Sequence, residues 1–138
     1  MSSGPLFMLD TDTVTFVLRD VGDAAATLLK HRPSTICMSA ITLSELRFGA
    51  DKRKSKRLHN LIDAFCRTVQ VASFGAAEAA AFGRVRAKLE SNGTPIGLFD
   101  TLIAAHALAL QLTLVTNNTK HFGKVGGLKT ANWSGEAG

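Results

Sequence analysis

A short apolar run near the N-terminus, Leu6–Leu9, constrains the fold of this chain more than any other feature. Four consecutive apolar residues are too few for a buried helix, and the lack of alternation with polar residues indicates a strand that is buried on both faces. Asp10 follows the run directly, and a helix-like apolar period then continues through Leu18, with Thr11 or Asp12 as its expected cap. A strand covered on both faces that leads at once into a helix is typical of a parallel sheet.

The rest of the chain repeats this alternation of short apolar runs and helical patterns. Four further strands are expected, at Thr35–Met38, Thr68–Ala72, Thr113–Thr116 and Leu128–Ala131. Helical patterns fill the intervals, at Asp23–Lys30, Ala40–Phe48, Lys52–Arg67, 75–91 and Phe99–Gln111. Gly49 is expected to end the helix that begins at Ala40. Because strand–helix–strand crossovers are right-handed, we expect an α/β fold: a three-layer α/β/α sandwich with a mostly parallel central sheet.

The domain organisation follows from length and composition. A chain of 138 residues has the size of one ordinary domain, and it contains no linker, internal repeat or low-complexity segment. We therefore expect residues 1–138 to form a single domain with an ordered core at about 6–133. The two ends, Ser2–Pro5 and Ser134–Gly138, are expected to be frayed.

Charge and hydropathy restrict the partners of the chain. Sixteen basic and eleven acidic residues give a net charge of +5. This excess argues against an acidic small-molecule binder or a solvating acidic module and favours a polyanionic partner, either nucleic acid or an anionic surface. The longest apolar stretch, Leu102–Val115, contains His106 and is too short to cross a bilayer. The N-terminus has no basic region ahead of its apolar run, so we expect no signal peptide. A protein of the cytoplasm, without a membrane partner, is expected.

Two acidic residues occupy positions where the surrounding pattern is apolar. Asp10 lies at the carboxyl end of the first strand, the edge where open parallel sheets bind ligands, although a lone Asp after a strand often caps a helix. Glu45 shares a helix face with Ile41 and Phe48. A buried Glu either pairs with an arginine or binds a cation.

Asp100 and the segment after the fourth strand extend this pattern. Asp100 lies in the first turn of a long helix, on the stripe that also carries Ile103 and Ala107. An acid that only stabilises the helix dipole can be fully exposed. The place of Asp100 on the apolar stripe therefore favours a role in a functional site. Asn117–Thr119 are ordinary turn residues, yet they follow the fourth strand and so lie at the same sheet edge.

Three acids converging at one edge repel each other, and their pKa values rise unless a cation compensates. Oxygen ligands without a Cys/His cluster indicate Mg²⁺, or Mn²⁺, rather than zinc. In a basic protein such a site suggests phosphodiester hydrolysis, in which the metal activates a water molecule.

Four segments of the sequence together resemble the PIN-domain ribonucleases, and within them the VapC toxins of type II toxin–antitoxin pairs. These segments are Met8–Asp12, Ile41–Ala50, Gly93–Ala107 and Val115–Thr119. The resemblance runs from about residue 6 to Trp133. Any one motif is weak, but four in this order and at this spacing are specific.

The resemblance implies a compact α/β/α sandwich with Mg²⁺- or Mn²⁺-dependent endoribonuclease activity. It places the catalytic and metal-binding acids at Asp10, Glu45 and Asp100. The fourth catalytic position of the family, often Asp, is Asn118 here, which removes a negative charge. Asp12 stands where the family usually has Asn, and we favour a helix-capping role for it. The resemblance also implies that the hydroxyls of two residues support the site, those of Thr11 and Ser44.

The family also implies the partners of the chain. These are a structured RNA such as tRNA, cut in a single-stranded loop, a second copy of the chain, and a VapB antitoxin. The C-terminal segment of such an antitoxin usually lies in the toxin groove and can present a basic side chain to the acids. The pair typically binds its operator DNA through the antitoxin rather than through the toxin.

The basic residues of the chain are concentrated close to the candidate site. Between positions 47 and 57 six basic residues and one acid, Asp51, give a local charge of +5. The six are Arg47, Lys52, Arg53, Lys54, Lys56 and Arg57. A solvated helix face has the same composition, but this stretch begins two residues after Glu45. We therefore expect it to hold RNA phosphates, with binding that weakens as salt rises.

Three other functions fit parts of the sequence. A metal-free ribonuclease would use a pair of histidines as general acid and base; the candidates are His31, His59, His106 and His121. Of these, His106 is expected in the core or on the surface, and His121 on the surface. A phosphoacceptor receiver domain would need an aspartate after the third strand, which instead ends at Val71–Ser73. A non-catalytic RNA-binding module of the same fold is favoured by the departure at Asn118.

Overall fold

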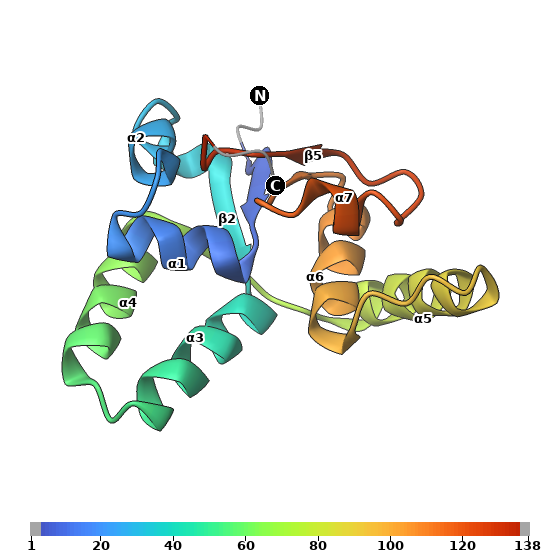
Figure 1. The fold of residues 1–138 in the computed structure, drawn as a ribbon, viewed down its shortest axis with the longest axis horizontal. Helices are drawn as coiled ribbons and strands as arrows, with labels where there is room; N and C mark the ends of the chain where they lie inside the picture. The colour runs from blue at the N-terminus through green and yellow to red at the C-terminus, as the bar shows by residue number, and fades with distance from the viewer. Residues whose placement is uncertain (1–3, 136–138) are drawn as a thin grey trace.

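The computed structural model describes residues 4–135. Within this part of the chain, five parallel strands form one sheet with the order β3-β2-β1-β4-β5 (Figure 1). The strands are β1 (Phe7–Leu9), β2 (Ile36–Ser39), β3 (Gln70–Ala72), β4 (Thr113–Val115) and β5 (Thr130–Ala131). In the register of the sheet, Phe7 lies between Ile36 of β2 and Thr113 of β4. The expected α/β sandwich with a parallel sheet is confirmed, and β1 is its central strand.

Helices cover both faces of the sheet. One layer consists of α1 (Thr11–Arg19), α2 (Ala24–Leu28), α3 (Ala40–Lys52) and α4 (Lys56–Thr68). The other consists of α5 (Ala76–Ser91), α6 (Leu98–Ala109) and α7 (Thr119–Phe122). A 3₁₀ turn at Pro33–Thr35 precedes β2. Figure 1 separates the layers, with α1, α3 and α4 on the left of the central strands and α5 and α6 on the right.

The side chains of the central strand explain why its sequence is uninterruptedly apolar. Met8 points into the core beneath α5 and α6, together with Leu114 of β4. Leu9 points into the opposite core, together with Met38 of β2. All four side chains are fully buried, and each such burial stabilises the fold by roughly 1.5–3 kcal/mol. The end of β1 therefore lies deep in the molecule, and Asp10 follows it there.

The third helix is longer than expected, because Gly49 does not end it. α3 continues to Lys52, and Gly49 has no positive φ that would turn the chain out of the helix. The next residue, Ala50, is fully buried in the core, so packing favours another helical turn. The chain turns instead at Lys54, where φ is 51°, and Ser55 caps α4 through a hydrogen bond to the Leu58 N–H (3.0 Å). The basic stretch 47–57 is therefore two helix ends and a turn, not one helix.

Two regions near the C-terminus also differ from expectation. The short helix α7 has no counterpart among the expected elements. Ser134, expected in a frayed end, is buried, and its carbonyl accepts a hydrogen bond from the Asp23 N–H (3.1 Å). Residues 1–3 and 136–138, where fraying was also expected, lie outside the described residues. Among residues 4–135, no helix is long and apolar enough to cross a membrane.

His106 connects the layer of α6 to the sheet. It is fully buried, and its Nδ1 lies 2.8 Å from Oγ of Ser39, the residue that also caps α3. The ring of Phe74 meets it edge-on with the ring centroids 5.2 Å apart. Burial is the main cause that lowers the pKa of His106 below its ordinary value of 6.5. His106 thus lies in the core, one of the two expected positions, but it is only half satisfied, because its buried Nε2 has no hydrogen-bond partner within the described residues.

We expect this buried histidine to make the fold sensitive to acid. Because its pKa is lowered in the folded state, the unfolded chain binds more protons once the pH falls below about 6.5. The contribution of His106 to the free energy of unfolding should therefore fall between pH 7 and pH 5, by at most about 1.4 kcal/mol per pH unit, whereas the acids with raised pKa values act in the opposite direction. Urea unfolding of the wild type and of His106→Asn at several pH values isolates this contribution. The stability of the wild type relative to the variant should fall as the pH falls, and a difference that does not change with pH would contradict the assignment.

Candidate active site

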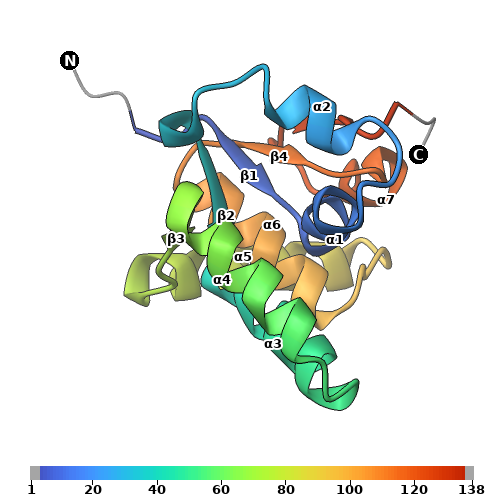
Figure 2. The ribbon, with the colours of Figure 1, turned by 90° about the vertical axis from the view of Figure 1, so that its left-hand side faces the viewer.

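The candidate site lies at the carboxyl edge of the parallel sheet. Asp10 follows β1, α3 starts directly after β2, and Thr116–Asn118 follow β4. Figure 2 shows the first turn of α1, the start of α6 and α7 on the side of the molecule toward which β1 points. Because all strands are parallel, the residues that follow them meet at one edge. The four residues expected at the site belong to four different segments that this edge brings together.

Asp10 is both a helix cap and a buried acid. Its side chain is only 4% exposed, and Oδ1 accepts a hydrogen bond from the Thr13 N–H (2.8 Å) at the start of α1. The expected caps, Thr11 and Asp12, do not have this role. Burial raises the pKa of Asp10 to about 6, against the opposing effect of hydrogen bonds from Thr116 and Thr13. The charge of Asp12 raises it further.

Glu45 reaches the site from α3 and is fixed there by a hydroxyl. Thr11 Oγ1 donates a hydrogen bond to Glu45 Oε1 (2.6 Å). Burial is the main cause that raises the pKa of Glu45, and the charges of Asp100 and Asp12 raise it further. Among the described residues no cationic side chain forms an ion pair with Glu45. The alternative expectation, that Glu45 forms a structural ion pair with an arginine, is therefore not met among residues 4–135.

Two neighbours of Glu45 differ from expectation. The hydroxyl of Ser44 donates to the Ala40 carbonyl (3.0 Å) on an exposed face, so it does not support the site as Thr11 does. Phe48 is 67% exposed, so the face it shares with Glu45 is only partly covered within this chain.

Asp100 is held by a histidine that was expected on the surface. His121 Nε2 lies 3.0 Å from Asp100 Oδ2 and 3.0 Å from the carbonyl oxygen of Ile96. Burial is the main cause that raises the pKa of Asp100, and the hydrogen bond and charge of His121 oppose it. His121 comes from α7, a helix too short for its sequence to show a period. The spacing Asn118-x-x-His121 from a cap to one turn later is the only sequence signal that could have found it.

The two asparagines after β4 have different roles. Asn118 is exposed and caps α7, where its Oδ1 accepts a hydrogen bond from the His121 N–H (3.3 Å). It therefore fixes the helix that carries the partner of Asp100. Asn117 Oδ1 is buried and has no hydrogen-bond partner within the described part of the chain. An unpaired buried oxygen is costly, and a cation or donor at this edge would satisfy it.

The donor chemistry of the edge fits a hard cation. The edge offers oxygen ligands: three carboxyl groups with raised pKa values and an unpaired amide oxygen. A hydroxyl, that of Thr11, supports one of the carboxyl groups. Asp12 adds a further negative charge felt by all three acids. Among residues 4–135, however, no three His, Cys, Asp or Glu side chains lie close enough together to enclose an ion. The residues that could hold one are Asp10, Glu45 and Asp100, after a shift of their side chains toward it.

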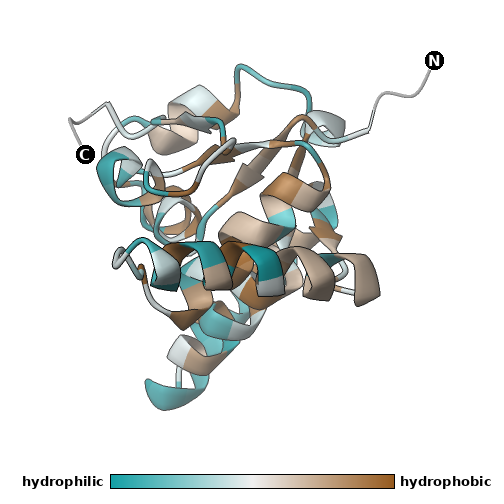
Figure 3. Ribbon diagram, turned by 90° about the vertical axis from the view of Figure 1, so that its right-hand side faces the viewer, coloured by the Kyte–Doolittle hydropathy of each residue, from teal (hydrophilic) through white to brown (hydrophobic). Residues whose placement is uncertain are grey.

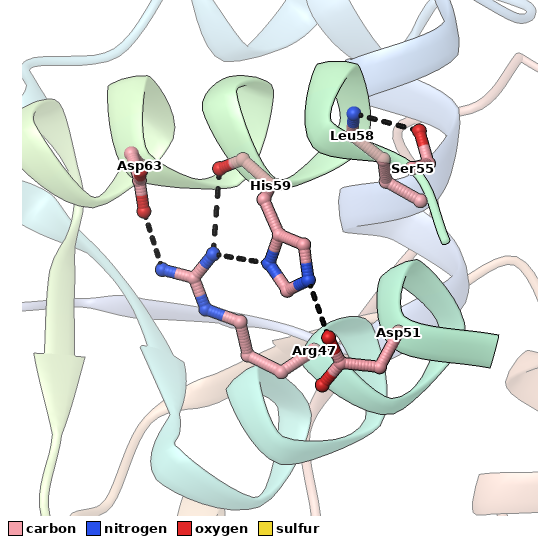
Figure 4. Close-up of polar contacts among 6 residues, drawn as sticks. All are labelled: Arg47, Asp51, Ser55, Leu58, His59 and Asp63. Atoms are coloured by element: carbon pink, nitrogen blue, oxygen red, sulfur yellow. Dashed lines mark hydrogen bonds and ion pairs between the residues drawn. The ribbon is translucent and has the colours of Figure 1, made fainter. Parts of the chain in front are cut away.

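Arg47 differs from the other residues of the basic stretch (Figure 4). Its guanidinium bonds Asp63 Oδ1 (2.5 Å), His59 Nδ1 (2.9 Å) and the His59 carbonyl (3.3 Å), and thereby ties α3 to α4. Because the guanidinium can only donate, His59 Nδ1 accepts, and its Nε2–H donates to Asp51 Oδ1 (2.8 Å). Arg47 is thus engaged inside the chain, which makes it a poor candidate for contacting a nucleic acid.

A cavity of about 150 Å³ adjoins the acids on the side of α1, α3 and α4. Thr11 and Glu45 line one part of it, and Arg19 and Arg53 another. The remaining lining is mostly apolar, from Thr15, Leu18, Leu46, Gly49 and Leu58. The cavity therefore suits a segment with an apolar side chain and a polar or charged end.

Comparison with known proteins gives consistent likenesses over nearly the whole chain. The family model of the PIN domain matches residues 7–128. The tRNA(fMet)-specific endonuclease VapC of Shigella flexneri is 38% identical over 129 residues, which are 93% of this chain and 98% of that protein. The solved structure of DNA-bound VapBC from Salmonella typhimurium matches with a TM-score of 0.88 and 33% identity, over 94% of this chain and 98% of that one. VapBC2 from Rickettsia felis, bound to a DNA fragment from its promoter, matches with a TM-score of 0.85 and 33% identity, over 93% and 98%.

We expect Asp10→Asn to stabilise the fold at neutral pH. The raised pKa means that the Asp10 carboxylate destabilises the folded state as the pH rises from about 4 to 6, by as much as about 3 kcal/mol. Asparagine keeps the helix cap and has no charge to bury. Urea unfolding in the presence of EDTA should show a higher midpoint for the variant at pH 7 and convergence with the wild type near pH 4. A variant less stable than the wild type at pH 7 would contradict the burial argument.

We expect Arg47→Gln to loosen the contact between α3 and α4. The substitution removes the ion pair with Asp63 and leaves His59 Nδ1 without its donor. The midpoint of urea unfolding should fall. Arg57→Gln, which removes an exposed arginine of the same stretch, is the matched control and should leave the midpoint nearly unchanged. Equal midpoints for the two variants would show that the network contributes nothing.

Proposed function

The chain belongs to the PIN domain family, in which its close relatives are VapC ribonucleases, and we propose that it is the ribonuclease toxin of a toxin–antitoxin pair. The observation that carries the proposal is that Asp10, Glu45 and Asp100 come from three segments at the carboxyl edge of the sheet and each have a pKa raised mainly by burial. Such groups are typical of sites that bind a cation and act on a phosphodiester. The whole chain, 1–138, is proposed to be one such domain.

We propose that the three acids hold Mg²⁺, with Mn²⁺ as a substitute. When bound, such an ion activates a water molecule and stabilises charge on the attacked phosphate. The residues of the chain position the acids for this. Thr11 holds Glu45 by its hydroxyl, and His121 holds Asp100. Asn118, the fourth expected catalytic residue, is proposed to act through α7 and His121 rather than as a metal ligand.

The proposed substrate is a structured RNA such as tRNA. Curated relatives from Shigella flexneri and Salmonella typhimurium are named as tRNA(fMet)-specific endonucleases. The basic stretch supports an RNA substrate, with Lys52, Arg53, Lys54, Lys56 and Arg57 exposed at the α3–α4 turn. Because these side chains neutralise phosphates, we expect affinity for RNA to fall as salt rises. An RNA substrate supports the proposal that the protein acts in the cytoplasm.

The proposed protein partners are a VapB-type antitoxin and a second copy of the chain. Two of the similar solved structures are DNA-bound VapBC complexes, and we propose that operator DNA is reached through the antitoxin. The cavity beside Glu45, with its apolar lining and two arginines, is a suitable seat for an antitoxin segment. Phe48, Leu98 and Phe99 are 67%, 54% and 50% exposed and are suited to cover one another across a dimer.

A non-catalytic RNA-binding module is the second candidate. It is favoured by the exposure of Asn118 and by the lack, among residues 4–135, of three acids that already enclose an ion. A metal-free mechanism with two histidines has less support. His31 stacks on Trp133, His59 bonds Arg47, and His106 is in the core. Among the described histidines, only His121 contacts an acid of the site.

Cleavage of total cellular RNA in Mg²⁺ tests the proposed function. Asp10→Asn and Asp100→Asn should each lower the cutting rate by about two orders of magnitude or more, because each removes an anionic ligand. EDTA should abolish cutting, and the products should carry a 5′-phosphate. Asp20→Asn, an exposed acid at the end of α1, is the matched control and should cut like the wild type.

Each other outcome has a distinct meaning. Wild-type rates in both site variants would show that the acids are misassigned. Full activity in EDTA with cyclic-phosphate products would exclude the metal mechanism. RNA binding by the wild type without cutting in either Mg²⁺ or Mn²⁺ would favour the non-catalytic module.

A further inference from the structure

A second basic surface lies on the layer opposite the α3–α4 turn. A hollow of about 360 Å³ opens between the C-terminal half of α5 and the segment that follows α7. Three cationic side chains line it: Arg84 and Lys88 from α5, and Lys124 from the segment after α7. These three residues are called the α5 cradle below. Figure 3 looks onto α5, whose first half is mostly apolar and whose second half carries strongly hydrophilic residues.

The charges of the α5 cradle are not compensated within the described chain. No ion pair joins Arg84, Lys88 or Lys124 to a carboxylate among residues 4–135. The two acids of α5 are engaged elsewhere, since Glu90 bonds Arg86 (3.0 Å) and Glu78 accepts from the Gly75 N–H (2.7 Å). Arg84 and Lys88 are also one helical turn apart, a spacing at which like charges destabilise a helix. An anion in the hollow would relieve both effects.

The lining of the hollow is partly apolar. Leu89 and Val125 line it and are buried in the core beneath α5 and α6, with Val85 packed against them. Asn92 adds an amide, and Gly126 leaves its position without a side chain. Cations around an apolar floor suit a phosphate group whose attached sugar and base have an apolar surface. This is the chemistry of a nucleotide within an RNA strand.

The two segments that carry the α5 cradle, α5 and the segment after α7, are both close in sequence to Asp100 or to His121, which contacts it. Lys124 follows the end of α7, three residues after His121, and its N–H donates a hydrogen bond to the His121 carbonyl (3.4 Å). His121 in turn contacts the Asp100 carboxylate (3.0 Å). On the other side, α5 ends at Ser91, and six residues separate it from the start of α6, which carries Asp100 in its first turn. Short segments of the chain therefore join both sides of the cradle to Asp100.

We propose that Arg84, Lys88 and Lys124 form a second phosphate-binding site, which holds the RNA substrate a few nucleotides from the cutting position. The inference rests on the proposed function and adds a contact to it. The acids then lie between two basic surfaces, the α3–α4 turn in one layer and the α5 cradle in the other. A structured RNA, with backbone on both sides of its cut loop, can contact both surfaces at once, whereas a short single strand contacts one.

The test is RNA binding by the variant Arg84→Gln/Lys88→Gln/Lys124→Gln. Its control, Lys30→Gln/Arg32→Gln/Lys129→Gln, removes the same three charges from exposed positions elsewhere. Binding of labelled, unfractionated bacterial tRNA is measured in EDTA between 50 and 200 mM salt, concentrations of about the range over which phosphate contacts weaken strongly. The slope of log affinity against log salt should fall by about two in the cradle variant, and the control should keep the wild-type slope. In Mg²⁺, the cradle variant should show a KM for tRNA raised about tenfold, with kcat close to that of the wild type.

The outcomes separate this inference from the proposed function. If the cradle variant and the control have equal slopes while the wild type binds and cuts RNA, the cradle is not an RNA site and the proposed function stands. If the cradle variant keeps its RNA affinity but loses affinity for the antitoxin, its occupant is an acidic protein segment and the inference is overturned. If the wild type neither binds nor cuts RNA, both fail together. Unfolding midpoints of the two variants show whether either has lost its fold.

Discussion

Burial of the Asp10 carboxylate at the end of the central strand is the constraint on which the rest of the site depends. β1 is apolar on both faces, so the residue that follows it is withdrawn from water whatever its type. A carboxylate is tolerated there because α1 begins at that point, and the Thr13 N–H, which has no partner within the helix, donates a hydrogen bond to it. Even so, the pKa of Asp10 remains raised to about 6. The helix start makes the buried acid tolerable without neutralising it, and a charge that remains uncompensated is what a cation can bind.

The other acids are positioned by single polar contacts from elements that packing has already fixed. Thr11 lies next to Asp10 on α1 and holds Glu45 of α3, so the same turn that buries one acid orients the second. His121 does the same for Asp100 from α7, and Asn118 caps that helix. Each contact crosses between segments more than twenty residues apart, except for the local one within α7. The geometry of the site therefore depends on the sheet that aligns these segments, not on any one motif.

How much of this the sequence predicts follows from the range of each interaction. The strands and the place of Asp10 were predictable because burial on both faces leaves an uninterrupted apolar run. Asp100 stands out because it interrupts a buried helix face, whereas the face of Glu45 is only partly covered, since Phe48 is 67% exposed. The length of α3 was not predictable, because Gly49 stays helical only through the packing of its neighbour Ala50. The role of His121 was hidden for a similar reason: α7 spans four residues and shows no period. Composition could not single out Arg47 among six basic residues, because its partner Asp63 lies sixteen positions away.

The charges of the chain are unevenly distributed in the fold. The net charge is +5, but the acids of the site lie at the sheet edge and basic side chains lie in both helical layers beside them. Without a cation, the acids repel the phosphates that the basic surfaces attract. In the proposed function, a bound cation would remove that repulsion at the scissile phosphate, while the basic surfaces would act on the phosphates farther along the strand. Cation binding and RNA binding should therefore strengthen each other, and the coupling comes from the placement of opposite charges on a rigid fold rather than from a conformational switch.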